Sequence, residues 1–401
     1  MERINKLRKG VMGTLAIFTL YLMFMSDNAL MVALDSIWEA FPDVSFDTLY
    51  YVVTVAQLVC IPCILICGAI VGKKLKFRTM AVISNVLMLV GGLGPVFVHS
   101  SFTTLLVFRG IYGAGFGLVY PLTDSLLIGN YSGSKLAKYW GWGTIFTNLA
   151  GILFSSIAVP LISKEWYNIY WAYALVIIPM ALIIFIPEPS ESGLEVEEAA
   201  GEGEIPAVKE KMSPFIWVIA ISLSVAMLAM LPSQMNISMI TDAAGLDVSV
   251  ASLAISLFTV GGMVASLLNE WFFKKFGMKE ISIGFVLCAV SQLLILPSNK
   301  ILIYIAFIVL GIGYTMQMLG LYMLLSLKTP LSTSATAMSI CGAMVNIAAF
   351  LLSGYSNIID IVFGNYLRST LIVGAVIFAV MAVAYLFVKA DMPEETEEVK
   401  E

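Results

Sequence analysis

Two ionisable side chains, Asp27 and Arg109, lie inside long apolar stretches of the sequence. Charged groups in hydrocarbon are costly, so both are functional candidates by default. Burial disfavours the charged form of a carboxyl and a nearby guanidinium favours it, so such a carboxyl can bind and release a proton as its surroundings change. Arginine suits the role of the constant positive charge because it does not deprotonate. The alternative is a structural ion pair that only joins two helices.

A second set of residues offers hydrogen bonds rather than charge. Amide and tyrosine side chains occur at intervals within the apolar stretches and are candidate substrate contacts. They are Asn28, Gln57, Tyr112, Tyr120, Asn148, Gln234, Asn236, Gln317 and Asn346. Polar groups in hydrocarbon must find partners, so a hydrogen bond between helices is the alternative role for each of them.

The composition excludes several other chemistries. Of the 401 residues, 60% are hydrophobic and 12% are charged, about half of the roughly 25% typical of a soluble domain. A net charge of −5 argues against nucleic-acid binding. With one histidine in the chain, Cys60, Cys63 and Cys67 are better explained as small hydrophobic residues than as metal ligands. No phosphate-binding loop or histidine-based catalytic set is present, so we expect neither an enzyme nor a cofactor.

The candidate residues require membrane-spanning helices to position them. A helix that crosses the hydrocarbon core needs about 20 apolar residues. The sequence contains twelve such stretches, at roughly 11–34, 48–71, 79–98, 101–128, 140–162, 166–186, 214–240, 249–272, 280–297, 300–327, 333–356 and 366–388. We therefore predict an all-α protein with twelve transmembrane helices in the lipid bilayer.

A polar segment separates the sixth and seventh stretches. Residues 188–212 are rich in glutamate and cannot bury a core, so they are predicted to form an acidic cytoplasmic linker. The N-terminal bundle then covers residues 1–187. The C-terminal bundle covers residues 213–401 and ends in a short acidic cytoplasmic tail.

Lysine and arginine cluster in alternate loops, which places both termini in the cytoplasm. The first helix then runs outward and the fourth runs inward. Asp27 lies about 16 residues along the first helix and Arg109 about eight residues along the fourth, roughly 24 Å and 12 Å at the helical rise. Both residues are therefore expected in the outer half of the bilayer, at nearly equal depth.

The two halves resemble each other weakly. Asn148 and Asn346 are related by an offset of 198 residues, and Gly110-Ile111 and Gly311-Ile312 by an offset of 201. Such matches occur in order and at nearly constant spacing. Two six-helix halves of like orientation around a central site are typical of many secondary transporters.

At this point the chain resembles the major facilitator superfamily over essentially its whole length. Arg109-Gly110 with Gly113, Gly115 and Gly117 is similar to the family's intramembrane arginine–glycine motif. The loop from Gly68 to Arg78 is similar to its glycine–acid–basic loop, although Gly72 stands where an acid is expected. The resemblance implies two six-helix bundles in which the helices that carry Asp27 and Arg109 line the central cavity. We therefore expect the two side chains to be coupled, with Asp27 carrying the proton.

The resemblance also implies a conformational latch at the cytoplasmic ends of the helices. In the family an acid near the end of the fourth helix often pairs with a base of the loop after the second helix. We expect Asp124 to form a salt bridge with Lys76, or with Lys73 or Lys135. In the second half, Glu270 and Lys274 fit the corresponding motif. An acid that simply reaches water is the alternative for Asp124.

The best functional hypothesis is a proton-coupled secondary transporter that alternates between inward- and outward-facing states. A buried acid, tyrosines and 22 methionines resemble the adaptable cavities of antiporters that export lipophilic or cationic organic compounds. The alternative is an uptake symporter in which Arg109 holds a small organic anion. A transporter-like membrane sensor is an alternative of another class. We expect a monomer in a bacterial inner membrane, with a small molecule and protons as its partners.

Overall fold

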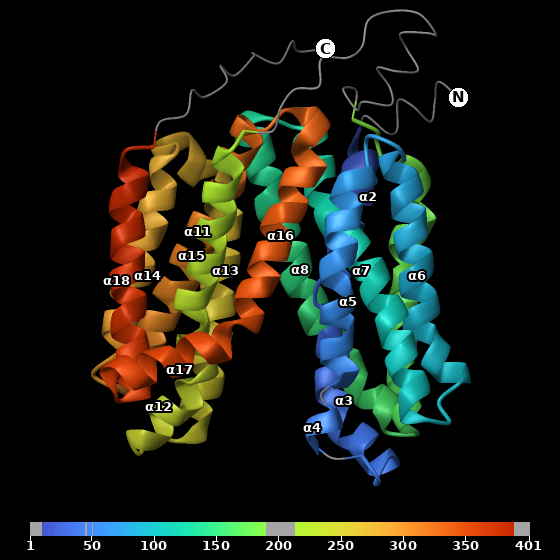
Figure 1. The fold of residues 1–401 in the computed structure, drawn as a ribbon, viewed down its shortest axis with the longest axis horizontal. Helices are drawn as coiled ribbons and strands as arrows, with labels where there is room; N and C mark the ends of the chain where they lie inside the picture. The colour runs from blue at the N-terminus through green and yellow to red at the C-terminus, as the bar shows by residue number, and fades with distance from the viewer. Residues whose placement is uncertain (1–9, 45, 50, 190–212, 389–401) are drawn as a thin grey trace, which may run out of the picture. The chain divides into compact units, whose positions relative to one another are not determined.

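The structure is a computed structural model that describes residues 10–44, 46–49, 51–189 and 213–388. In these ranges the chain is helical, and its one β-bridge joins Val71 and Leu75 (Figure 1). The predicted linker and acidic tail fall mostly outside the described residues. Each of the twelve predicted stretches corresponds to one helix or to a run of consecutive helices, so the predicted all-α fold is confirmed.

The first six spans are formed by ten short and long helices. They are α2 (Val11–Tyr21), α3 (Asp27–Ala40), α4 (Phe46–Leu49), α5 (Tyr51–Ile70), α6 (Phe77–Phe97), α7 (Phe102–Asn130), α8 (Gly133–Ile162), η1 (Trp166–Val176), α9 (Ile177–Leu182) and η2 (Ile183–Phe185). The sixth span is therefore mainly 3₁₀-helical, with the short α-helix α9 between η1 and η2.

The last six spans follow the same plan. They are formed by α11 (Phe215–Met235), α12 (Ile237–Ala243), α13 (Val248–Phe276), α14 (Lys279–Ile295), α15 (Lys300–Lys328), η3 (Leu331–Thr333), α16 (Ser334–Phe350), α17 (Leu352–Phe363) and α18 (Tyr366–Leu386). Among the described residues, nine helices are long and apolar enough to cross a membrane by themselves.

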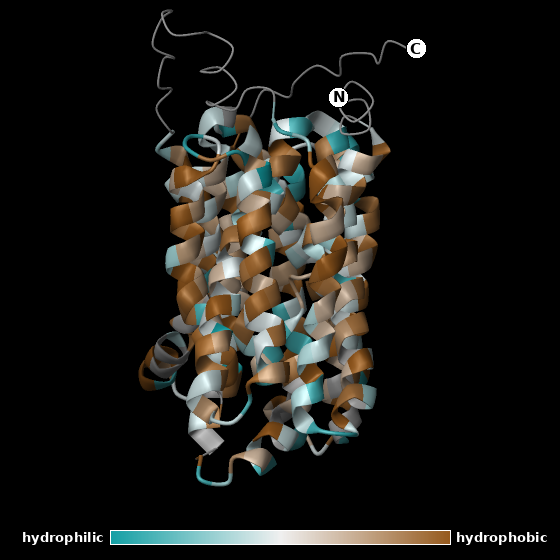
Figure 2. Cartoon of the chain, turned by 90° about the vertical axis from the view of Figure 1, so that its right-hand side faces the viewer, coloured by the Kyte–Doolittle hydropathy of each residue, from teal (hydrophilic) through white to brown (hydrophobic). Residues whose placement is uncertain are grey.

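Large apolar side chains point away from the protein along the helices. On α6 Val82, Val86 and Val90 are exposed at a spacing of four residues, and on α18 Val376 and Val380 are exposed at the same spacing. Figure 2 shows hydrophobic residues, in brown, along most of the length of the helices. Exposed apolar stripes of this length would be unfavourable in water, so these faces contact lipid.

The first span differs from the single helix that the sequence predicts, because it is broken between α2 and α3. Within the break the amides of Met23 and Phe24 donate to carbonyls three residues back rather than four. The i−4 ladder of an α-helix is thus replaced by the tighter 3₁₀ pattern. The break ends at Asp27, the first residue of α3. The sequence carries no glycine or proline there, so the polar contacts of Ser26 and Asp27 described below favour the break.

The seventh span is broken at the corresponding place. Pro232 lies in the last turn of α11, and Asn236 separates α11 from α12. Proline lacks an amide hydrogen and weakens the helix around it. Interrupted helices in matching positions of two halves are a feature of many transporters, where they lie next to the binding site.

The described chain divides into two compact units, each of which consists of three segments. Unit 1 contains residues 1–130, 143–212 and 330–343, and unit 2 contains residues 131–142, 213–329 and 344–401. The units therefore follow the two halves of the sequence, except that the start of α16 packs in unit 1 and the start of α8 packs in unit 2. In unit 2, for example, Asn269 donates to the carbonyl of Ala137 at 2.6 Å.

The segment that follows η2 is attached to the start of α6 in unit 1. The backbone amides of Phe77 and Arg78 donate to the carboxylate of Glu188, at 3.0 and 2.9 Å, and Arg78 Nη2 donates to the carbonyl of Ile186. A carboxylate at a helix N-terminus satisfies free amides and complements the helix dipole. These contacts hold the last described residues of the first half in place.

Glycines allow α7 to pack closely against α5. A Cβ added at Gly113 would clash with the carbonyl and Cα of Ala56, and one added at Gly117 would lie 2.5 Å from the carbonyl oxygen of Cys60. By contrast, a Cβ added at Gly110 would meet only valine methyl groups, the nearest 3.8 Å away on Val59. The close approach at Gly113 brings the turn of α7 that carries Arg109 against the start of α5.

We predict that Gly113→Ala destabilises the protein by about 1–3 kcal/mol, because the added methyl group forces two helix backbones apart. Gly110→Ala is the matched control and should change stability little, since its methyl group meets its neighbours at ordinary van der Waals distance. Thermal unfolding of the purified proteins in detergent measures both. Equal midpoints for the two variants would contradict the packing described here.

Candidate functional site

Asp27 and Arg109 form an ion pair in unit 1, with Arg109 Nη2 2.7 Å from Asp27 Oδ1. Arg109 lies on α7 and is completely buried, whereas the side chain of Asp27, at the start of α3, keeps 23% of its surface exposed. The positive member of the pair is thus sealed in the protein, and the carboxyl remains accessible from one side.

The guanidinium of Arg109 is held by two further hydrogen bonds. Its Nε donates to the carbonyl of Val52 on α5 at 2.6 Å, and Nη1 donates to the hydroxyl of Tyr173 on η1 at 3.2 Å. Its Cζ lies 5.0 Å from the ring centroid of Tyr112, within the range of a cation–π interaction. Contacts from α5, η1 and α7 itself therefore orient the guanidinium whether or not Asp27 is charged.

The second carboxylate oxygen of Asp27 is more weakly held. Gln57 Nε2 on α5 donates to Oδ2 at 3.4 Å, and the Tyr173 hydroxyl approaches Oδ1 at 3.5 Å. Both distances are long for hydrogen bonds. Oδ2 is therefore the less firmly held of the two carboxylate oxygens.

An aromatic surface continues from the ion pair along α7. Ser26, next to Asp27, is hydrogen bonded to the hydroxyl of Tyr112. Phe116 and Tyr120 follow Tyr112 at intervals of four residues, and Phe24 stacks on Tyr120 with ring centroids 5.0 Å apart. Phe116, Tyr120 and Phe24 are only partly buried. This apolar face adjoins the carboxyl within the same unit.

The structure brings together the sequence-predicted residues Asp27, Arg109, Gln57 and Tyr112. Asn28 lies next to Asp27 and close to Gly151 of α8, where a Cβ would meet its amide nitrogen at 3.0 Å. Asn148 is partly buried elsewhere on α8.

The remaining predicted contacts belong to unit 2. Gln234 and Asn236 lie at the break between α11 and α12, and Asn346 is partly buried on α16. Gln317 is completely buried on α15. As substrate contacts, all these residues stay predictions.

The residues of the predicted latch have partners within their own units. Asp124 Oδ1 accepts a hydrogen bond from the hydroxyl of Tyr21 at 2.5 Å. Lys73 Nζ donates to Thr336 Oγ1, at the start of α16, at 2.7 Å, and Lys76 is exposed. The salt bridge between Asp124 and a loop lysine stays a prediction.

In unit 2, Glu270 connects α13 with the start of α8. Its carboxylate lies 3.0 Å from Lys274 Nζ, one turn away, and 3.5 Å from Lys138 Nζ. All three side chains are about a third to a half exposed. Exposed pairs of this kind contribute little to stability.

Tyr173 belongs to the site but was not among the predicted residues. Tyr167, Tyr170 and Tyr173 are spaced by three, which is the repeat of the 3₁₀-helix η1, and the rings of Tyr170 and Tyr173 stack with centroids 6.2 Å apart. This spacing was a usable signal in the sequence. The carbonyl of Val52 has no such signal in the sequence, because every residue has a backbone carbonyl group.

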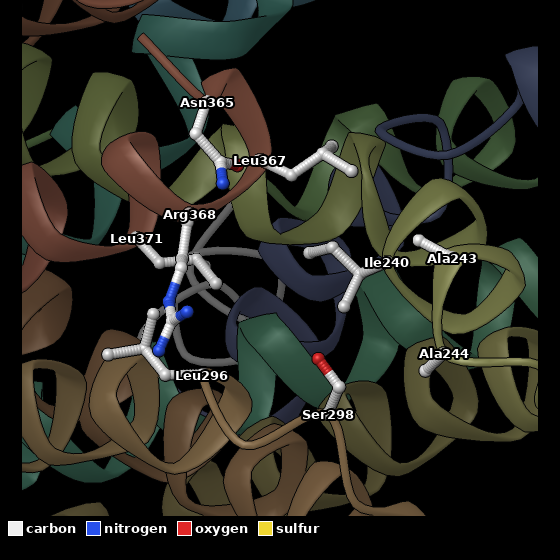
Figure 3. Close-up of a pocket in the computed structure, with 9 residues that line it drawn as sticks. All are labelled: Ile240, Ala243, Ala244, Leu296, Ser298, Asn365, Leu367, Arg368 and Leu371. Atoms are coloured by element: carbon white, nitrogen blue, oxygen red, sulfur yellow. The ribbon is translucent and has the colours of Figure 1, made fainter. Parts of the chain in front are cut away.

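A surface cavity of about 230 Å³ lies in unit 2, apart from these residues (Figure 3). It is lined by Ile240, Ala243, Ala244, Leu296, Ser298, Asn365, Leu367, Arg368 and Leu371. Its one charged group, Arg368, is exposed, unlike Arg109. Among the described residues, no group of three histidine, cysteine or acidic side chains is arranged to hold a metal ion.

Comparison with known proteins shows what the chain is similar to. The sequence profile of the Major Facilitator Superfamily matches residues 16–281 and 218–401. No match was found among curated proteins.

Solved structures show the same fold at low sequence identity. The proton:xylose symporter XylE is 15% identical with a TM-score of 0.74, covering 94% of this chain and 96% of its own. The fucose:proton symporter FucP of E. coli is 13% identical with a TM-score of 0.71, covering 95% and 99%. The human organic anion transporter MFSD10 is 12% identical with a TM-score of 0.74, covering 93% and 99%.

We predict that Asp27→Asn costs up to about 3–5 kcal/mol of stability, because it leaves the buried Arg109 without its counter-charge. The double variant Asp27→Asn/Arg109→Gln should regain part of this loss, since the unpaired charge is gone. Glu270→Gln, which breaks an exposed pair, is the control and should cost about 0–1 kcal/mol. Thermal unfolding in detergent measures all three, and additive losses in the double variant would contradict the coupling.

Proposed function

The chain belongs to the major facilitator superfamily of membrane transporters, and from this premise we propose that it is a secondary active transporter driven by the proton gradient. It works by alternating access and exports small lipophilic or cationic organic compounds. The observation that carries the proposal is the ion pair between a sealed arginine and a partly exposed aspartate.

The ion pair couples proton binding to substrate binding. Asp27 takes up a proton in a conformation in which its contact with Arg109 is broken, because no positive charge then offsets the cost of a carboxylate in an apolar surrounding. A substrate cation next to Asp27 favours the carboxylate and displaces this proton. Substrate and proton therefore compete for one group, which is the requirement for antiport. Re-protonation after the substrate leaves returns the carboxyl to its starting state.

The aromatic surface beside Asp27 supports a lipophilic substrate. Phe24, Phe116 and Tyr120 are partly accessible, and Met25 next to Phe24 is 40% exposed. Aromatic rings attract organic cations through their faces, and a flexible thioether adapts to different shapes. A negative charge beside such a surface fits lipophilic cations.

Uptake of an organic anion by Arg109 is less well supported. The guanidinium is completely buried, and its three nitrogen atoms donate to Val52, Tyr173 and Asp27. An anion would have to displace Asp27 before it reached the positive charge. The two solved proton symporters and the organic anion transporter are similar to this chain in fold alone, at 12–15% identity.

The proposal also covers the membrane, the orientation of the chain in it and the oligomeric state. We propose a bacterial inner membrane, both termini in the cytoplasm, and a monomer as the working unit. The basic loops between alternate helices support this orientation. A protease added to sealed right-side-out vesicles should leave both termini intact.

Purified protein in liposomes with an imposed pH gradient tests the proposed function. Ethidium is the lipophilic cation probe and benzoate the anion probe. We predict that ethidium moves against the proton flux in the wild type. Asp27→Asn should lose accumulation driven by the pH gradient and keep exchange of ethidium across the membrane, because the neutral amide cannot exchange a proton.

Asp43→Asn, which removes an exposed acid outside the ion pair, is the matched control and should transport like the wild type. Unchanged pH dependence in Asp27→Asn would rule out the proton role of Asp27. Benzoate uptake together with protons would support the symporter instead. If neither probe nor protons move, a membrane sensor becomes the better explanation.

A further inference from the structure

A second acid, Glu280, is buried in unit 2 without a partner. It lies in the first turn of α14, is 0% exposed, and neither of its carboxylate oxygens has a hydrogen-bond partner. Among the described residues no ion pair reaches it either. By contrast, the acids Asp27 and Glu270 are partly exposed and paired.

Glu280 faces α15 in a tightly packed interface. A Cβ added at Gly320 of α15 would lie 3.1 Å from both Cγ and Oε1 of Glu280. One turn further along α14, a Cβ at Gly284 would lie 2.7 Å from the carbonyl oxygen of Gly313. Such contacts leave no space for a bulky counter-ion between the two helices.

The same interface buries a second unpartnered polar side chain. Gln317 lies on α15, one turn before Gly320, is 0% exposed, and has no hydrogen-bond partner for its amide nitrogen or oxygen. A Cβ at Gly284 would lie 2.9 Å from its Cβ, so Gln317 packs on α14 next to the turn of Glu280. The interface therefore holds an acid and an amide and supplies no positive charge.

Among the described residues, no charged side chain of the surrounding helices forms an ion pair with Glu280. The charged and titratable residues whose side chains are described on α13, α15, α18 and α14 itself are Glu270, Lys274, Lys275, Lys300, Tyr304, Tyr314, Tyr322, Lys328, Arg368, Tyr385, Lys279 and Cys288. Lys274 pairs with Glu270, Lys275 lies 4.5 Å from the Trp271 ring centroid, and Tyr385 donates to Ser222. Lys279 and Lys328, the bases nearest in sequence and at the matching helix end, are exposed.

An ionised carboxylate in this position would carry an uncompensated charge. The desolvation penalty of a buried charge is large, and a group in such a place keeps its proton instead. The N-terminus of α14 favours a negative charge, but this effect is smaller than the desolvation penalty. A proton needs no space, so the close packing at Gly320 does not oppose it.

We propose that Glu280 is a second proton-binding site of this protein, neutral while α14 and α15 are packed together. Water that enters the interface would solvate the carboxylate, so the carboxyl gives up its proton only when the two helices separate at their Glu280 ends. Protonation of Glu280 and close packing of α14 on α15 therefore stabilise each other. The protonation does not depend on Asp27, and only its use in transport rests on the proposed function.

Infrared spectroscopy of the purified protein at neutral pH tests the protonation directly. The wild type should show the C=O absorption of a protonated carboxylic acid that Glu280→Gln lacks, because glutamine replaces the acid with an amide of the same shape. Asp242→Asn, which changes an exposed acid of the same unit, should keep the absorption. Since Asp27 is present in all three proteins, its state cancels in the difference. Identical spectra for wild type and Glu280→Gln would overturn the proposal.

Wild-type protein made with ¹³C-carboxyl-labelled glutamate needs no substitution. The absorption should move to lower frequency on labelling, since the other described glutamates are exposed or have partners. An absorption that does not move, or none at all, would also overturn the proposal.

The pH dependence of stability gives a second readout. A carboxyl that is neutral in the folded protein is ionised after unfolding above about pH 4, so unfolding releases a proton and rising pH favours the unfolded state. The thermal midpoint of the wild type should therefore fall relative to that of Glu280→Gln between about pH 5 and pH 9. Asp242→Asn should follow the wild type. Parallel curves for wild type and Glu280→Gln would contradict a neutral Glu280.

Discussion

The structure of unit 1 depends on one constraint: a guanidinium in an apolar interior must be surrounded by acceptors. Arg109 is completely buried, and it satisfies this constraint with the carboxylate of Asp27, the carbonyl of Val52 and the hydroxyl of Tyr173. These partners come from α3, α5 and η1. The position of one side chain on α7 therefore determines where three other elements must lie. An unpaired charge there would cost more than any single packing contact in the unit contributes.

The break in the first span follows from the same constraint. In an uninterrupted α-helix, successive residues point about 100° apart around the helix axis. With the 3₁₀ segment before Asp27, Ser26 and Asp27 both contact α7, through Tyr112 and Arg109. The matching break at Asn236 in unit 2 lacks a buried charge of this kind among the described residues. Among the described residues of unit 2, Glu280 is the buried acid without compensation, inside the α14–α15 interface. Asp27 in one half is thus paired with an arginine, whereas Glu280 in the other half is enclosed without a partner.

Much of the fold could be predicted from the sequence, because the length of an apolar stretch and the distribution of lysine and arginine are direct consequences of the bilayer. The nearly equal depth of Asp27 and Arg109 also follows from counting residues along two antiparallel helices, and the structure has their side chains in contact. What could not be predicted depends on helix rotation and on backbone contacts. The carbonyl of Val52 has no sequence signature, and the helix break carries neither glycine nor proline.

Glu280 shows where residue counting is insufficient. The predicted ninth span begins at this residue, and an acid at the end of a span usually reaches water. Its complete burial and the packing of Gly320 against its carboxyl show that this one points inward. The position of Tyr173 could be predicted only in part from the sequence. Its spacing from Tyr167 and Tyr170 marks one face of a 3₁₀-helix, whereas the α-helical repeat turns each successive tyrosine about 60° from the one before and so does not align all three.

The central claim is that Asp27 exchanges a proton for a substrate cation beside a constant positive charge. It is tested most directly by adding ethidium to the purified protein in weakly buffered detergent solution and following proton release with a pH indicator. The wild type should release protons in proportion to the ethidium that binds, and Asp27→Asn should release none at the same occupancy. Equal proton release from both proteins, or ethidium binding by the wild type without any release, would contradict the account.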